Sequence, residues 1–151
     1  MTALHLDLSS PEGVVLAGYA LISGRATETR DWALFRSLHA PNARLMPVST
    51  TGDDVAVESF DVDAYIDSRT TMLAAADFFE QEVARRVNRF QDVAHVWSAY
   101  EARRAHDADP FLRGVNSVQV VHRAGRWWIL TVFWQAVAPD APAPDDFFPR
   151  Q

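Results

Sequence analysis

The chain has 151 residues and 48% hydrophobic content, which suffices for one domain with a buried core and is too small for two ordinary domains. A formal charge of −6 excludes the basic field that nucleic acids and anionic membranes require, and favours a neutral or cationic small ligand. The absence of cysteine excludes disulfides, thiolate nucleophiles and cysteine metal sites.

The sequence carries no targeting, metal or nucleotide signal. Residues Met1 to Ser10 hold neither a basic nor an apolar segment of the secretory kind, and no apolar run reaches the length of a membrane span. The five histidines lack HExxH or HxH spacing, and no glycine-rich phosphate loop is present. We therefore expect a cytoplasmic protein with no cofactor, no metal, no nucleic acid partner and no membrane partner.

Two short helices are predicted first. Ser10 provides a hydroxyl cap and Pro11 suits the first helical position, which indicates a helix over roughly 11–23. Thr29 can cap a second helix, whose apolar stripe carries Trp32, Phe35 and His39.

Two short strands and a third helix follow. The runs 43–48 and 55–60 have strand-like composition and flank a polar turn. Asp61 then caps a helix whose apolar stripe has Arg69 at its edge.

Long alternating runs fill the rest of the chain and predict strands over 79–90, 93–104, 113–122 and 127–137. Gln91 with Asp92 and Ala124 with Gly125 form tight links, and Gly125 supplies the positive φ of a hairpin turn. Helices first and long antiparallel strands last indicate the α+β class. The proline-rich tail over 138–151 is irregular, with Phe147 and Phe148 available to dock on the body.

Four motifs stand in a recognisable order: LHAPNA at 38–43, DVAHVWS at 92–98, RGVNSVQ at 113–119 and GRWWI at 125–129. By these motifs the chain resembles the nuclear transport factor 2-like (NTF2-like) superfamily, especially its ketosteroid isomerase-like and SnoaL-like branches, over roughly 11–137. The resemblance implies one domain over 1–137, a cone-shaped curved antiparallel sheet wrapped around three helices and enclosing a pocket. This fold hosts enzymes and inert binding modules alike.

The hairpin turn places His122 opposite Trp127. If the two strands continue to pair without interruption, the residue numbers of each opposing pair have the same sum, and every side chain of the hairpin can be assigned to one face of the sheet. Similarity to ketosteroid isomerases selects the inward face, because their inward acid and aromatic match Ser117 and Trp134. The side chains then expected to point inward are Ser98, Tyr100, Ser117, Gln119 and Trp134.

Ketosteroid isomerases use a carboxylate base, a phenol and a protonated acid. The resemblance places the phenol at Tyr19 on the first helix, but puts Ser117 in place of the acid and Pro47 in place of the base. Glu80 and Glu82 on the first long strand are the candidates to replace that base. A buried glutamate with a raised pKa beside Tyr100 or Gln119 would indicate an enzyme.

The candidate catalytic residues are thus Glu80, Glu82 and Tyr19, and the candidate ligand-binding residues are Tyr100, Ser117, Gln119, Trp134, Ser98 and Trp32. Each also has a structural interpretation, as a solvated surface acid, a core aromatic or a bonded polar group. Two functions stay open. One is a cofactor-free isomerase, cyclase or dehydratase acting on a small apolar carbonyl compound. The other is a non-catalytic binding or protein-interaction module. In either case an apolar outer sheet face predicts a homodimer; its expected side chains are Trp97, Val118, Val120, Ile129 and Phe133.

Overall fold

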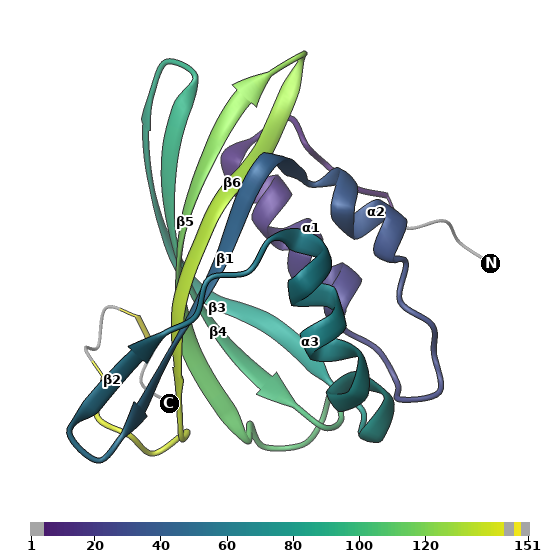
Figure 1. The fold of residues 1–151 in the computed structure, drawn as a ribbon, viewed down its shortest axis with the longest axis vertical. Coiled ribbons are helices and arrows are strands. Elements are labelled where there is room, and N and C mark those ends of the chain that lie inside the picture. The colour runs from purple at the N-terminus through teal and green to yellow at the C-terminus, as the bar shows by residue number, and fades with distance from the viewer. Residues whose placement is uncertain (1–4, 144–146, 149–151) are drawn as a thin grey trace.

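The computed structural model describes residues 5–143 and 147–148. Three helices, α1 (Pro11–Ile22), α2 (Trp32–Ser37) and α3 (Val62–Ala75), cover one face of a curved six-stranded sheet (Figure 1). The strands are β1 (His39–Thr51), β2 (Asp54–Val57), β3 (Phe79–Phe90), β4 (Val93–Arg103), β5 (Leu112–Arg123) and β6 (Arg126–Val137). The predicted α+β class and the long C-terminal strands are confirmed.

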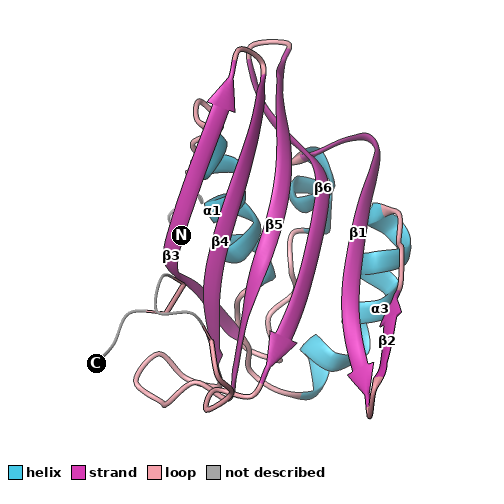
Figure 2. Ribbon diagram, turned by 90° about the vertical axis from the view of Figure 1, so that its left-hand side faces the viewer, coloured by secondary structure: helices cyan, strands magenta, loops and turns pink. Residues whose placement is uncertain are grey.

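The strand order across the open sheet is β2-β1-β6-β5-β4-β3 (Figure 2). Every ladder is antiparallel except β1 with β6, in which Leu45 pairs with Val132 in the parallel sense. The sheet is therefore mixed, and the expectation of a purely antiparallel sheet is wrong at this one ladder. Hairpins impose the antiparallel sense on sequential strands, whereas β1 and β6 meet from distant parts of the chain.

Side-chain caps fix the helix starts. Ser10 Oγ accepts a hydrogen bond from the Gly13 amide, and Asp61 caps α3 in the same way. The second helix is capped by Asp31 and not by Thr29, and it ends at Ser37. As a result His39, predicted on that helix, is the first residue of β1.

The β5–β6 hairpin turns as predicted and then departs from a simple ladder. Gly125 has φ 78°, and His122 pairs with Trp127. Farther along, the register shifts between Gln119 and Val120, leaving Leu130 of β6 as an extra residue. Such a β-bulge exchanges the faces of all later residues on that strand relative to its partner.

The core lies between the inner sheet face and the helices. Val14, Leu38, Val96 and Trp127 are fully buried there, and each large apolar side chain contributes about 1.5–3 kcal/mol by leaving water. On the outer face, the Phe147 ring lies 5.7 Å from that of Trp97. None of the helices within 5–143 and 147–148 is long and apolar enough to cross a membrane.

Candidate functional site

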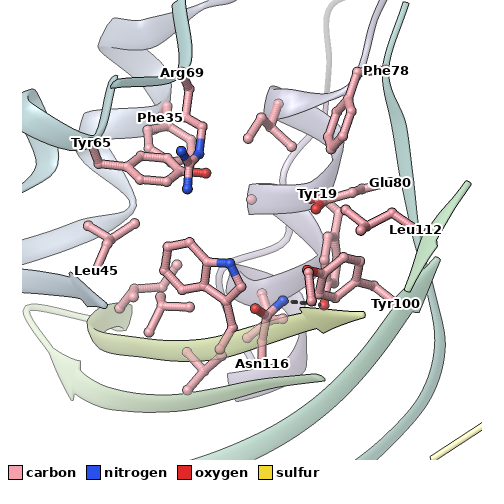
Figure 3. Close-up of a pocket in the computed structure, with 18 of the residues that line it drawn as sticks. Tyr19, Phe35, Leu45, Tyr65, Arg69, Phe78, Glu80, Tyr100, Leu112 and Asn116 are labelled. Carbon is pink, nitrogen blue, oxygen red and sulfur yellow. Dashed lines mark hydrogen bonds between the residues drawn. The ribbon is translucent and has the colours of Figure 1, made fainter. Parts of the chain in front are cut away.

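A cavity of about 310 Å³ lies between the inner sheet face and the helices (Figure 3). Apolar side chains form most of its wall, among them Phe35, Leu45, Phe78, Leu112 and Val118. A small set of polar groups converges on it, including Tyr19, Tyr65, Arg69, Glu80, Tyr100 and Asn116. An apolar enclosure with a few convergent polar groups is typical of small-molecule sites.

Glu80 reaches the cavity from β3. It pairs with Ala102 on β4, so its side chain shares the inner face with the diagonal neighbour Tyr100. Burial raises the pKa of the Glu80 carboxyl to about 7, against the opposing attraction of Arg69. Within the described part of the chain, this carboxyl accepts no hydrogen bond and forms no ion pair. Near neutral pH it can therefore either take or give a proton.

Three phenols line the cavity together with this carboxyl: Tyr19 and Tyr100 lie on the Glu80 side, and Tyr65 lies beside Arg69 on the opposite side (Figure 3). Burial raises the pKa of all three, and the charge of Glu80 raises each further, so they remain neutral hydrogen-bond donors. The Tyr100 hydroxyl has no protein partner among the described residues. It packs over Gly114, where an added Cβ would lie 2.6 Å from the phenol oxygen, and glycine alone leaves that room.

A buried hydrogen-bond chain orients Tyr19. Ser98 Oγ donates to Glu82 Oε2 at 2.7 Å and lies 2.6 Å from Tyr19 Oη. Since a carboxylate only accepts and Ser98 has one proton, the Tyr19 hydroxyl must donate to Ser98. Asn116 Nδ2 also donates to Tyr19 Oη, at 2.8 Å. The Tyr19 proton is thus directed away from the cavity.

The Glu82 side chain does not line the cavity, and it contacts Ser98 outside the cavity wall. Burial raises the pKa of its carboxyl, while the hydrogen bond from Ser98 and the guanidinium of Arg85, 3.0 Å away, lower it. Its connection to the cavity runs through Ser98 and Tyr19. Glu82 and Ser98 are therefore placed to position the phenol and do not line the space a ligand would occupy.

Arg69 enters from α3, on the side of the cavity opposite Glu80 (Figure 3). Its guanidinium carbon lies 5.1 Å from the Tyr65 ring centroid and 5.9 Å from that of Trp134. His39 also lines the cavity, but its Nδ1 is 2.9 Å from the Phe35 carbonyl oxygen, and burial lowers its pKa to about 4. His39 is consequently a neutral packing residue at physiological pH.

Of the side chains predicted to line the site, Tyr19, Glu80, Tyr100 and Trp134 do so. Trp32 instead packs edge-on against Phe35, with ring centroids 5.5 Å apart, and is absent from the cavity wall.

The expected inward orientation of Ser117 and Gln119 is wrong. Ser117 shares a hydrogen bond of 2.9 Å with His95 Nε2, and Gln119 accepts one from Thr131, both away from the cavity. The bulge at Leu130 is the cause. It lets Trp134 face inward as expected, but opposite Asn116 and not opposite Val115. The inward polar residue of β5 is therefore Asn116, which was expected on the outer face. Three apolar residues expected on the outer face are likewise buried on the inner one, namely Val118, Val120 and Ile129.

Sequence reasoning also missed Tyr65 and the role of Arg69. An arginine at the edge of an apolar helix stripe was the available signal for Arg69. Among the described residues, no group of three or more histidine, aspartate or glutamate side chains could hold a metal ion.

No family model matches the sequence, and no curated protein matches it either. Solved structures do. A protein of unknown function with a cystatin-like fold from Nostoc punctiforme has a TM-score of 0.66 at 14% identity, covering 94% of this chain and 98% of that one. A ketosteroid isomerase-like protein from Shewanella frigidimarina has a TM-score of 0.56 at 18% identity, covering 87% and 99%.

An NTF2-like protein of unknown function from Pseudomonas putida has a TM-score of 0.63 at 11% identity, covering 87% of this chain and 93% of that one. These similarities define the chain as a protein of the NTF2-like fold, as its motifs indicated. At such identities they establish the fold alone, so its chemistry has to be argued from the cavity.

Proposed function

We propose that this protein is a cofactor-free acid/base enzyme that moves a proton on a carbon next to the carbonyl of a small, largely apolar ligand. One observation carries the proposal. Glu80 presents an unpaired carboxyl, with its pKa raised to about 7, inside an apolar cavity beside Tyr100. A glutamate of this kind favours an enzyme over an inert binding module, because a buried, unpaired carboxyl lowers the stability of the folded protein and such groups cluster at functional sites.

The reaction needs only groups that this chain supplies. The Glu80 carboxylate takes the α-proton, the C–H bond breaks, and its electron pair forms a carbon–carbon double bond as the carbonyl oxygen becomes negative. The Tyr100 hydroxyl donates a hydrogen bond to that oxygen, because no protein group within the described residues uses it. Protonated Glu80 then returns the proton to another carbon in an isomerisation, or to a departing hydroxyl in a dehydration.

Proton exchange tests this proposal without knowledge of the substrate. A panel of small ketones, beginning with phenylacetone, is incubated with protein in heavy water, and α-deuteration is followed by NMR. We expect protein-dependent exchange that increases as pH rises through about 7, where Glu80 ionises. Glu80→Gln should reduce the rate at least about a hundredfold.

Glu58→Gln, on the exposed surface, is the matched control and should leave the rate unchanged. Exchange that survives Glu80→Gln would reject Glu80 as the base. No protein-dependent exchange across the panel would instead favour the second candidate, a binding module, which the largely apolar cavity wall also suits.

Assembly as a homodimer is part of this proposal. The outer sheet face exposes large apolar side chains, namely Phe90, Val93, Trp97, Leu130 and Phe133. A second copy covering this face would remove them from water, in an interface typically on the order of 1,600 Å². Phe147 already lies against part of the same face, so the chain's own tail would border such an interface.

A further inference from the structure

The charge of the cavity differs from that of the whole protein. The chain has a formal net charge of −6, yet the cavity wall holds two guanidinium groups, Arg69 and Arg104, and a single carboxyl, Glu80. His39 adds no charge, because its pKa is lowered to about 4. A ligand inside the cavity responds to these nearby groups more than to the screened surface charge. The cavity is therefore a local positive region in an acidic protein.

The two arginines are not equivalent. Arg104 lies at the exposed rim, where its guanidinium stacks 3.8 Å from the Phe111 ring centroid and donates to the Asp77 carbonyl oxygen. Arg69 is half-buried and contacts the aromatic faces of Tyr65 and Trp134. Among the described residues, no carboxylate lies within 4.0 Å of Arg69. Glu80 attracts this guanidinium only from the opposite side of the cavity, so Arg69 has no adjacent acid, and a ligand carboxylate could pair with it directly.

From this arrangement we infer that Arg69 anchors a carboxylate on the ligand, which makes the ligand class small oxo acids with an apolar body. Its carbonyl end would lie toward Glu80 and Tyr100, and its carboxylate toward Arg69, on opposite sides of the cavity. A guanidinium matches the two oxygens of a carboxylate, and one such group balances a monoanion and not a phosphate dianion. The position of the carbonyl rests on the proposed function, whereas the anion site does not.

The test compares two probes of nearly the same shape, the anion cinnamate and its neutral amide cinnamamide, by isothermal titration calorimetry. We expect wild-type protein to bind cinnamate at least about tenfold more tightly, as for a hydrogen-bonded ion pair in a partly dry site. Arg69→Gln should reduce cinnamate affinity to that of the amide and leave amide affinity unchanged. Arg69→Lys should retain part of the preference. Arg104→Gln should retain most of it, because that guanidinium lies at the exposed rim where solvent screens its charge.

Equal affinity for the two probes, a preference that survives Arg69→Gln, or no cinnamate binding at millimolar concentration would each overturn the inference. Circular dichroism of each variant separates lost binding from lost folding. Glu80→Gln distinguishes this inference from the proposed function, since it removes a like charge and should preserve or strengthen cinnamate binding. If the wild-type protein shows the carboxylate preference but catalyses no proton exchange, only the catalytic proposal is rejected.

Discussion

Replacement of Glu80 by glutamine should stabilise the protein, and increasingly so as pH rises. Burial raises the pKa of this carboxyl from an ordinary value of 4.5 to about 7. Above pH 4.5 the unfolded chain loses this proton while the folded chain keeps it until about pH 7. The folded state therefore binds more protons over that interval, and its stability falls as pH increases.

The size of the effect follows from the two pKa values. Each pH unit between them corresponds to about 1.4 kcal/mol, so the full cost of the buried carboxylate is about 3 kcal/mol and is reached above pH 7. A neutral glutamine removes that cost. For a chain of this length, the gain corresponds to a rise in Tm on the order of 10 °C at about pH 8, shrinking to a few degrees or less at about pH 5.

Urea unfolding followed by tryptophan emission, at several pH values from about 5 to 9, measures the difference directly. Glu58→Gln on the exposed surface provides the matched baseline and should change the free energy of unfolding by no more than about 0.5 kcal/mol. A Glu80→Gln effect independent of pH, or a wild-type protein more stable than the variant at about pH 8, would refute a buried carboxyl with a raised pKa.

Three further changes test other parts of the structure. Ser98→Ala removes one hydrogen-bond partner each from the Tyr19 phenol and the Glu82 carboxylate, and should lower the free energy of unfolding, measured with urea, by about 1–3 kcal/mol. A loss below about 0.5 kcal/mol would contradict the buried hydrogen-bond chain through Ser98. Gly114→Ala forces a Cβ against Tyr100 and should cost about 1–3 kcal/mol, whereas Gly18→Ala meets nothing within 4 Å and should be neutral or stabilising. Light scattering should report a dimer for the wild type and a monomer for Phe133→Glu, and a wild-type monomer at micromolar concentration would reject the dimer.

Local signals explain what the sequence could predict. Ser10 and Asp61 lie at true helix starts because their side chains cap nearby amides, a short-range interaction readable from a few residues. The long strands were predictable because alternation persists over about ten residues in each. Glu80 could be proposed as a base because few acids occur on those strands.

What could not be predicted depends on tertiary structure. Leu130 looks like any other strand residue, so nothing in the sequence indicates that it forms a bulge, yet it decides whether Ser117 or Asn116 faces the cavity. The position of Arg69 opposite Glu80 depends on how α3 packs over the sheet, which helical periodicity does not specify. Sequence alone therefore predicted several side chains that line the cavity, among them Tyr19, Glu80 and Tyr100, and assigned the side chains of β5 to the wrong faces.

The parallel ladder between β1 and β6 also bears on how the protein folds. Leu45 pairs with Val132, so the ladder joins segments separated by most of the chain. Closing so large a loop costs chain entropy before any contact is gained, and contacts of this kind slow folding. During synthesis, the edge of β1 that pairs with β6 would stay without a partner until β6 emerges from the ribosome. This exposed edge is then the part of the nascent chain most open to aggregation or to a chaperone.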